Sequence, residues 1–560
     1  MRLKKPKTYA LLAAIPALAL AATTACTASA THSNDKTAFV FAGAGDPKSL
    51  DPSLASDGET FRVTRQVFEG LLTHKSGGTK IVGQLAKTWD TSKDGKTWTF
   101  HLHDNVKFHD GSKLTAQVVC DNYDRWFNWK GTYQNAAVST YWQDTFGGFK
   151  HNESKETPPP NYNSCTAKDD LTPVIKVNHA SARLPGGFTL ASMGIHSPKS
   201  LKTYAKESAP KGDDPAKLTY PDYSQKAGEA AGTGPYKYKK WDHGESEVTL
   251  TRFDGYWNAK EKAHIKTMIV KTIPKENDRK QALLSDEIQG YDLVAPQDVS
   301  TLKDKGMQVP KRGVFNLMYL GMDQKKDGKK TPLADKRVRE AIAQAINKKK
   351  IIKQIYPPGA TVAKEFLAPT LDGYSDDVKT YDYNKDAAKK LLKDAGQSKL
   401  KIDLCEPTDV TRPYLPDPED VSQNIKADLE AIGVTVTENP MKWNPDYQDA
   451  VNNGKCSLYI LGWTGDYNEA YNFLGTWFGT YKDSWGFKDK KIFDLLDKID
   501  NEPSVSKRKD MYVEANNLIM KYLPGVPIAH SPPSIAFASY VNPPKVSPLT
   551  SENFAETSFK

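Results

Sequence analysis

Apolar positions recur with helical spacing in several segments of this chain. Residues 337–352 have apolar side chains three or four positions apart, which predicts a helix. The same spacing over residues 386–395 predicts a helix that ends at Gly396, and over residues 421–432 it predicts one that ends at Gly433. A glycine just after a helix is typical because the backbone turns left-handed there.

Other segments have the composition and spacing of strands. Residues 97–102 (TWTFHL) are rich in aromatic and β-branched side chains, and a β-branched run at 434–437 directly follows a predicted helix. Residues 456–463 form an apolar run that predicts a buried strand. Strands interleaved with helices predict an α/β protein with parallel sheets. Ligands of such sheets collect beyond the carboxyl ends of the strands, so residues 463–468 are expected where a ligand would bind.

The first 25 residues have the pattern of a secretory leader. Four cationic residues precede an uncharged, mostly apolar stretch at 9–22, and small residues then lead to Cys26. The stretch is shorter than the roughly 20 apolar residues that a membrane-spanning helix needs. We therefore expect residues 1–25 to be a signal peptide and the rest of the chain to be exported.

Cys26 is the expected site of lipidation. A cysteine directly after such a leader resembles a lipobox, in which the thiol is acylated and becomes the mature N-terminus, although Thr23 stands where lipoboxes usually have Leu. Residues 26–36 are short, polar and rich in Ser and Thr, which predicts a flexible tether. The alternative is cleavage near Ala28 or Ala30, which would leave a free soluble protein.

Length and charge narrow the class of protein. A chain of 560 residues exceeds what one hydrophobic core usually supports, so two or three lobes are expected. The formal net charge of +9 falls to about +5 without the four cations of the leader, and the other basic residues are scattered among 68 acidic ones. Nucleic-acid binding would need a clustered basic face and is therefore not expected.

Four cysteines follow Cys26, at Cys120, Cys165, Cys405 and Cys456. An even number of cysteines in an exported chain favours disulfides, and the lack of any CxxC spacing argues against a zinc site. Four cysteines permit three pairings. Proximity along the chain favours Cys120–Cys165 and Cys405–Cys456.

Short motifs follow one another in order over most of the chain. They are SLDP at 49–52, VFEGLL at 67–72, QLAKTW at 84–89, DGKTWTFHL at 94–102, VKFHDG at 106–111, LTA at 114–116, GTGPY at 232–236, RVREAI at 337–342, GW at 462–463 and DYNE at 466–469. In this joint order they resemble the extracytoplasmic solute-binding proteins of family 5, the oligopeptide- and dipeptide-binding class that serves ABC importers. Asn347, Ala470 and His103 depart from residues frequent in the family, so the ligand subclass stays open.

The resemblance implies a fold and a division of the chain. The fold would be α/β and periplasmic-binding-protein-like (type II, cluster C), with two lobes in a Venus-flytrap arrangement and an extra N-terminal subdomain. Lobe I would comprise residues 37–71, 191–315 and 529–560. The extra subdomain would comprise residues 72–190, and lobe II residues 316–528.

The implied function is capture of a solute without catalysis. Two lobes would close on a peptide, whose higher affinity for the closed form would stabilise it, and the closed protein would dock on the permease subunits of an ABC importer. The protein would act as a monomer at the extracytoplasmic face of the cell membrane, held there by its lipid anchor. No cofactor or metal is expected.

Asp466 is the main candidate for ligand contact. The resemblance implies that this aspartate accepts the α-ammonium group of a bound peptide, and a carboxylate just beyond a buried strand suits such a charge-assisted bond. Trp463 is expected to be a wall of the site, with Tyr467 and Asn468 as further ligand contacts. The alternative is that Asp466 caps the helix predicted after it.

Two further patterns are read as structural. The glycines of 232–236 lack the strand and helix context of a phosphate-binding loop. His101, His103 and His109 suggest a metal site, but the same stretch resembles an ordinary strand of peptide-binding family members, so a structural role is favoured.

Three other functions stay open. Oligosaccharides are the second choice of ligand, because 11 Trp and 26 Tyr could stack on sugar rings, and nickel chelates are the third. The alternative from another class is a secreted hydrolase of peptides or glycans. The chain has no GxSxG or HExxH motif, while its many carboxylates leave a glycosidase pair open.

Overall fold

The computed structural model describes residues 38–155, 157–206, 208–212 and 218–560. The predicted signal peptide (1–25), the predicted tether (26–36) and Cys26 lie outside the described residues. No helix within the described ranges is both long and apolar enough to cross a membrane.

Two six-stranded sheets organise the chain. The first sheet has the order β20-β11-β1-β10-β9-β8, built from β1 (Ala38–Gly43), β8 (Tyr236–Asp242), β9 (Glu247–Arg252), β10 (Thr267–Thr272), β11 (Gly290–Val294) and β20 (Ser534–Phe537). The second has the order β15-β19-β12-β18-β16-β17, built from β12 (Asn316–Met322), β15 (Thr361–Val362), β16 (Lys401–Thr408), β17 (Thr435–Lys442), β18 (Leu458–Thr464) and β19 (Gly525–His530).

A third sheet of four antiparallel strands has the order β4-β5-β7-β6, with β4 (Ala86–Thr91), β5 (Thr97–Leu102), β6 (Tyr162–Ala167) and β7 (Pro173–Val177). Three two-stranded ribbons complete the strands: β2 (Leu72–His74) with β3 (Ile81–Gly83), β13 (Lys325–Lys326) with β14 (Lys329–Lys330), and β21 (Val541–Asn542) with β22 (Ser558–Phe559).

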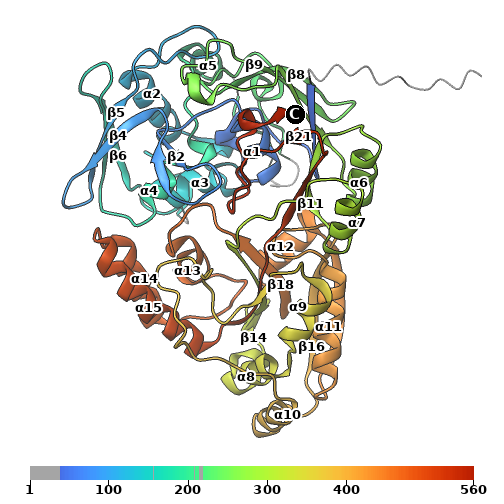
Figure 1. Ribbon diagram of the computed structural model, residues 1–560. Helices are drawn as coiled ribbons and strands as arrows, with labels where there is room; N and C mark the ends of the chain where they lie inside the picture. The colour runs from blue at the N-terminus through green and yellow to red at the C-terminus, as the bar shows by residue number, and fades with distance from the viewer. Residues whose placement is uncertain (1–37, 156, 207, 213–217) are drawn as a thin grey trace, which may run out of the picture. The chain divides into compact units, whose positions relative to one another are not determined.

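Helices connect and cover these sheets (Figure 1). Those before residue 310 are α1 (Gly58–Thr64), α2 (Ala116–Phe127), α3 (Ala136–Phe146), α4 (Leu184–Gly187), α5 (Pro198–Tyr204), α6 (Glu276–Leu284) and α7 (Val299–Asp304). Those after it are α8 (Lys336–Ala345), α9 (Lys348–Ile355), α10 (Lys385–Asp394), α11 (Pro418–Glu430), α12 (Gln448–Asn452), α13 (Tyr471–Phe478), α14 (Lys490–Asn501) and α15 (Val505–Tyr522).

The buried apolar side chains form two separate clusters. The first core contains residues between 39 and 309 and Tyr467, and the chain returns to it with residues 535–555. The second core contains residues between 315 and 529 and Leu549. Figure 1 shows this return as the dark-red segment that runs from the second sheet back beside β11 and continues into β21. Two cores in one chain agree with the expectation that its length exceeds a single core.

The expectation of parallel sheets is only partly correct. In the first sheet β1 is parallel to β10 and β11, but β8, β9 and β20 join antiparallel. In the second, β16 is parallel to β17 and β18, whereas β12 runs antiparallel to β18 and β19. Both sheets are therefore mixed. Successive strands β8, β9 and β10 are neighbours in the first sheet and run antiparallel in turn, whereas β20 and β12 pair antiparallel with strands far away in the chain.

The helix predicted over 337–352 is two helices in the structure. Ile346 adopts an extended backbone, and the Asn347 side chain accepts a hydrogen bond from the Lys350 amide at 3.0 Å, so α9 begins anew. Asparagine is a preferred N-cap residue, and apolar spacing alone does not reveal such a break. The helices ending before Gly396 and Gly433 and the strands at 97–102 and 458–464 confirm the other predictions.

The chain passes between the two cores as two neighbouring segments. Asn316 donates a side-chain hydrogen bond to the Ser531 carbonyl at 2.8 Å and accepts one from the Ser531 amide at 3.0 Å. Beside them, the buried guanidinium of Arg312 donates to Asp292 at 2.5 Å and to Glu552 at 2.7 Å. These contacts join segments far apart in the sequence at the place where the chain changes cores.

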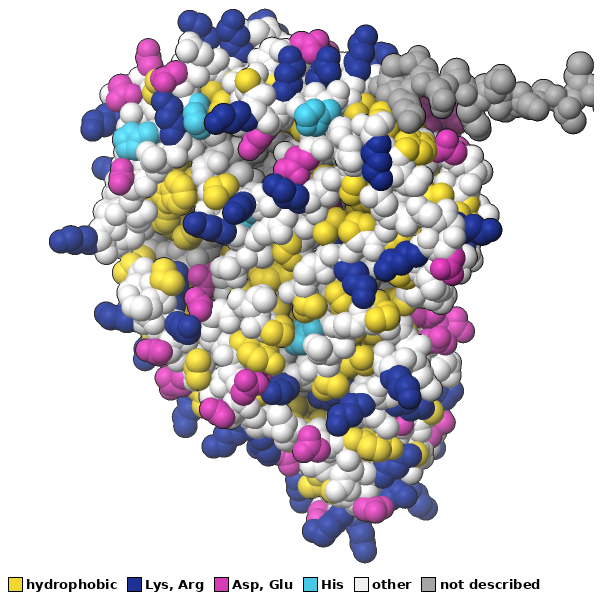
Figure 2. Space-filling view, viewed as in Figure 1, with side chains coloured by type: hydrophobic (Ala, Val, Ile, Leu, Met, Phe, Trp, Pro, Cys, Tyr) yellow, Lys and Arg dark blue, Asp and Glu magenta, His cyan; other side chains and the backbone are white. Residues whose placement is uncertain are grey.

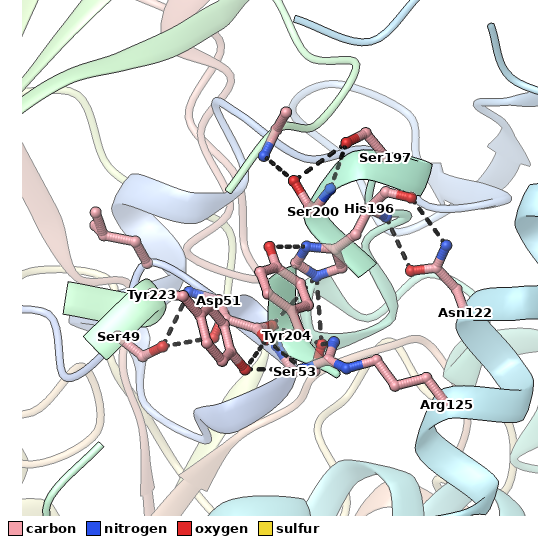
Figure 3. A network of polar contacts seen from close by, with 12 residues as sticks. Ser49, Asp51, Ser53, Asn122, Arg125, His196, Ser197, Ser200, Tyr204 and Tyr223 are labelled. Carbon is pink, nitrogen blue, oxygen red and sulfur yellow. Dashed lines mark hydrogen bonds and ion pairs between the residues drawn. The ribbon is translucent and has the colours of Figure 1, made fainter. Parts of the chain in front are cut away.

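The SLDP motif forms the centre of a buried polar network (Figure 3). Arg125 and Tyr223 donate hydrogen bonds to one carboxylate oxygen of Asp51, at 2.6 and 2.9 Å. Its other oxygen accepts from Ser53 at 2.7 Å and lies 3.2 Å from His196 Nε2. Arg125 and His196 lower the pKa of Asp51 well below its usual value despite its burial. Through the Arg125–Asp51 pair, this network holds α2 against the first core.

Residues of two other motifs are hydrogen-bonded to each other. Glu69 of VFEGLL is buried and accepts hydrogen bonds from Thr233 of GTGPY and from Tyr256, both at 2.7 Å, and from Trp257 at 2.9 Å. Gly232 lies so close to the main chain that a Cβ there would meet the Val67 carbonyl oxygen at 2.1 Å. The GTGPY segment thus has a structural role, as predicted.

Each disulfide joins a pair that proximity in the sequence favours. Cys120 on α2 bonds to Cys165 on β6, and Cys405 on β16 bonds to Cys456, which precedes β18. The segment at 151–170, which has no periodicity in the sequence, contains β6. The sequence of this segment does not predict a strand. Pairing with β7 and the disulfide bond to α2 therefore stabilise β6.

The described surface carries charges of both signs. On the face shown in Figure 2, Lys and Arg side chains alternate with Asp and Glu, and neither sign covers a broad area of that face. This distribution agrees with the scattered charges of the sequence and differs from the clustered basic face of nucleic-acid-binding proteins.

Replacing Asp51 by Ala should strongly destabilise the protein. The change leaves the Arg125 guanidinium buried without its carboxylate, which typically costs about 3–5 kcal/mol. Urea unfolding at pH 7 measures the loss. Asp222→Ala is the matched control, because Asp222 pairs with Lys226 on an exposed surface, where such pairs contribute about 0–1 kcal/mol. Equal losses in the two variants would show that the network does not stabilise the first core.

Candidate functional site

The loop that carries Asp466 follows a central strand of the second sheet. β18 lies between β12 and β16 and is parallel to β16, so its carboxyl end points to the same edge as that of β16. Gly462 within β18 has no room for a side chain, because a Cβ there would meet the Leu317 carbonyl oxygen at 2.3 Å. The loop thus lies beyond a strand end, where ligands of α/β sheets are usually bound.

Three hydrogen bonds fix Asp466. The hydroxyl of Tyr141 on α3 donates to its Oδ1 at 2.9 Å, and the side-chain amide of Asn472 on α13 donates to its Oδ2 at 3.2 Å. The amide oxygen of Asn472 accepts from the Asp466 backbone N–H at 2.8 Å. Each carboxylate oxygen therefore keeps acceptor capacity for a further donor, because a carboxylate has about four lone-pair sites.

Asp466 does not cap the following helix. α13 begins at Tyr471, its N-cap position is Ala470, and no side chain there makes the capping bond. Asn472 in the first turn of α13 instead reaches back to the Asp466 amide. The helix-cap alternative is therefore wrong, and the carboxylate has no role within the helix.

Burial raises the pKa of Asp466 to about 6. The hydrogen bonds from Asn472 and Tyr141 favour the ionised form and oppose this rise, Asp144 adds to it, and Arg65 opposes it weakly. A carboxylate in such surroundings is poorly compensated. An added ammonium group would supply the missing charge, so the site suits a cation.

Trp463, Tyr467 and Asn468 lie in three different environments. Trp463 is half-buried against the second core, and its indole N–H donates to Asn472 at 3.2 Å. Tyr467 is buried in the first core, where its ring leaves no space for a side chain at Gly186. Asn468 is exposed. Trp463 and Asp466 are thus both hydrogen-bonded to Asn472, whereas the Tyr467 ring is packed in the first core.

Tyr141 and Asn472 are site residues that sequence reasoning missed. Tyr141 is 325 residues from Asp466, in a helix that carries no recognised motif. Asn472 lies only six residues away. Its polar side chain stands among the apolar residues of α13 (YNFLGTWF), which is a signal that could have identified it.

A second set of contacts, like the Tyr141–Asp466 bond, joins residues before position 190 to residues after position 460. Asp500 at the end of α14 accepts hydrogen bonds from the Arg183 guanidinium at 2.7 Å and from the Ser181 hydroxyl at 2.7 Å. Its carbonyl accepts from the Ala182 amide at 2.8 Å. Residues 141 and 181–183, which precede the second core in the chain, therefore contact Asp466 and Asp500, which come from the part of the chain that forms the second core.

The three histidines of the motif region have separate partners. His101 lies 3.2 Å from Asp90, His103 packs on the Trp257 ring, and His109 Nε2 lies 2.9 Å from the Gly234 carbonyl oxygen. Among the described residues, no group of three or more His, Cys, Asp or Glu side chains is arranged to hold a metal ion.

Comparisons with known proteins agree on the family. The model of the bacterial extracellular solute-binding proteins of family 5 (middle region) matches residues 80–485. The chain is 28% identical to the dipeptide-binding protein of Escherichia coli strain K12 over 93% of this chain and 94% of that protein. It is also 26% identical to heme-binding protein A of Haemophilus influenzae over 89% of this chain and 88% of that protein.

A solved structure shows the same fold. The periplasmic binding protein DppA of Helicobacter pylori, determined in complex with the peptide STSA, is 25% identical and superposes with a TM-score of 0.76. The match covers 93% of this chain and 98% of that one. The two-lobed periplasmic-binding-protein fold predicted from the sequence is therefore confirmed.

Replacing Asp466 by Asn should stabilise the ligand-free protein at pH 7. The pKa of Asp466 is raised in the folded protein above the unfolded value near 3.9, so its ionised form opposes folding, and stability decreases as pH rises from about 4 to 6. We expect a gain of about 1–3 kcal/mol at pH 7 that shrinks at pH 5, measured by urea unfolding at both values.

The control for this measurement is Asp494→Asn. Asp494 pairs with Lys490 on the exposed side of α14, where the change should alter stability by less than about 1 kcal/mol at both pH values. A loss of stability in the Asp466 variant at pH 7 would contradict the electrostatic account, because it would mean that the ionised carboxylate contributes to folding.

Proposed function

This chain belongs to the bacterial extracellular solute-binding proteins of family 5, and from that premise we propose that it captures peptides and delivers them to an ABC-type importer. Family members bind solutes outside the cytoplasm and are not enzymes, and the similar proteins named above include a dipeptide-binding protein and one solved with a peptide. The proposal assigns no catalytic step to this chain.

The observation that carries the proposal is the state of Asp466. Its carboxylate is held by Tyr141 and Asn472, has spare acceptor capacity, and has a pKa raised to about 6 by burial. A peptide α-ammonium is the complement of such a group, since a charge-assisted hydrogen bond is roughly twice as strong as a neutral one. In this proposal Trp463 is a wall of the site, and Tyr467 and Asn468 are further ligand contacts.

We further propose that the ligand is enclosed by closure of two lobes. Lobe I would comprise residues 37–71, 191–315 and 529–560 with the subdomain 72–190 attached, and lobe II residues 316–528. The Tyr141–Asp466 and Arg183–Asp500 bonds support this idea, because they join the subdomain attached to lobe I to lobe II. A ligand that contacts both lobes would favour the closed state.

A peptide fits the site better than an oligosaccharide does. An oligosaccharide of neutral sugars has no ammonium group to pair with Asp466, whereas every peptide with a free N-terminus has one. The heme-binding relative shows that other ligands occur among similar proteins, so the comparison of peptides with and without a free N-terminus is the decisive experiment.

The proposed location is the outer face of the cell membrane. Family members act outside the cytoplasm, and lipidation at Cys26 after removal of residues 1–25 would keep the protein near its importer, at a raised local concentration. A single acyl chain holds a protein only marginally, so the proposed anchor carries more than one.

Asp466→Ala should weaken peptide binding by about 2–5 kcal/mol, the range for removing one partner of a buried charged pair. Calorimetric titration with a di- or tripeptide at pH 7 measures the loss. Affinity of the wild type should also fall below pH 6, where Asp466 becomes protonated, and above about pH 8, where the peptide α-amino group loses its proton.

The same peptide with an acetylated N-terminus is the matched control. It should bind wild type as weakly as the free peptide binds the Asp466→Ala variant, with no further loss in the variant. The peptide should also be recovered intact at one per chain. Equal affinity for free and acetylated peptides would remove Asp466 from the site, and cleavage of the peptide would favour the hydrolase.

Cys26→Ser should release the protein from cells into the medium. The serine hydroxyl cannot replace the thiol that lipobox processing acylates, so the chain would lose its anchor while keeping its fold and its peptide affinity. Immunoblots of membrane and medium fractions measure the distribution. Retention of the variant on the membrane would show that Cys26 is not the anchor.

A further inference from the structure

A large cavity lies within the second part of the chain, away from the Asp466 loop. Its volume is about 1200 Å³, and its walls come from the end of α8, from α9, from β15 and the two residues after it, from residues 376–383, and from the end of α15 and the start of β19. Buried apolar side chains form one part of the lining: Ala343, Ile346, Met520, Leu523 and Val526. None of the residues in contact with Asp466 lines it.

The rest of the lining is strongly basic. Five lysines face two acidic residues in the cavity wall: Lys348, Lys349, Lys350, Lys353 and Lys364 against Asp376 and Asp382. Among the described side chains, only Lys364 of these five makes an ion pair, with Asp376 at 2.6 Å. The wall therefore has an excess of positive charge, in contrast to the mixed surface of Figure 2.

Three of these lysines occupy an electrostatically unfavourable position. Lys348, Lys349 and Lys350 are the first three residues of α9, whose first turn contains no acidic residue. The N-terminal end of a helix carries a partial positive charge, so anions are stabilised there and cations are not. The Asn347 side chain already caps this helix end at the Lys350 amide, so a bound anion would mainly compensate the consecutive lysines, which oppose the helix dipole.

Lys348 is the most enclosed of the three. Its Nζ reaches the Ala363 carbonyl oxygen only at 3.5 Å, the outer limit of a hydrogen bond. Burial lowers the pKa of Lys348 to about 8, although Asp382 opposes the shift. The Lys348 ammonium group thus has three N–H donors and makes one long hydrogen bond. It can donate to a further acceptor at the cavity wall.

We propose that this cavity binds a phosphate ester with an apolar portion, its phosphate at the lysines of α9 and its apolar part against the buried side chains. Lysine ammonium groups favour phosphate. Tyr383 at the cavity wall is 44% exposed, which is unusual for a large side chain here, and it offers a further apolar surface. The ligand is either a free small molecule or the headgroup region of a membrane lipid, which present the same chemistry.

Octyl phosphate is the probe for this site. Calorimetric titration of the mature protein should show one molecule bound per chain, with an affinity at least about tenfold weaker in a Lys348→Gln, Lys350→Gln double variant, since a contact between charged partners contributes roughly 1.4 kcal/mol or more. Inorganic phosphate alone should bind at least about tenfold more weakly than octyl phosphate, because it cannot use the apolar lining.

The matched control is a Lys389→Gln, Lys393→Gln variant. Both lysines are exposed on α10 outside the cavity, so the net charge changes equally while octyl phosphate binding should stay at the wild-type value. Peptide affinity should be unchanged in both double variants, which separates this site from the proposed peptide site. Absence of saturable octyl phosphate binding, or equal binding by the two double variants, would overturn the proposal.

Vesicles distinguish the two sources of the ligand. The Cys26→Ser chain, which lacks the proposed anchor, is sedimented with vesicles of phosphatidylglycerol or of phosphatidylcholine. Binding to phosphatidylglycerol that the Lys348→Gln, Lys350→Gln variant loses would identify a membrane lipid. Octyl phosphate binding without vesicle binding would identify a free phosphate ester, and either result supports the cavity as the site.

Discussion

The pairing of Arg312 is the interaction on which the joining of the C-terminal return to the first core depends. Its guanidinium is buried where the chain leaves the first core, and it donates to Asp292 of β11 and to Glu552 of the C-terminal return. Asp292 accepts in addition from Arg62 of α1 at 2.6 Å. A buried charge without its partner costs several kcal/mol, so all these segments must arrive together.

The same constraint explains three of the motifs that carry the family resemblance, SLDP, VFEGLL and GTGPY. Asp51 with Arg125 and Glu69 with Thr233 are buried polar groups whose partners come from another motif or another helix. Because a buried polar group must be hydrogen-bonded, each residue of such a pair requires the other. These motifs are therefore requirements of the fold, and they resemble a binding site only in being polar.

Asp466 and the α9 lysines depart from this rule, and their departure suggests binding. Asp466 is held by neutral donors and keeps a raised pKa. Lys348 has one long hydrogen bond beside a helix end of like charge. Groups that the fold leaves poorly compensated lower its stability, and proteins keep them where a ligand completes them. The ligand proposed for the first site is a cation, and the ligand proposed for the second is an anion.

The sequence alone determined the local structure of much of this protein, because helical and strand spacing, glycine positions and cap residues act within a few residues. It placed the strand at 458–464, the loop with Asp466 after it, and the family. It did not determine that β20 joins β11 or that β12 lies between β18 and β19, since these pairings join strands far apart in the chain. Tyr141 is the clearest case. It lies 325 residues from Asp466, and only tertiary packing brings its hydroxyl within 2.9 Å of that carboxylate.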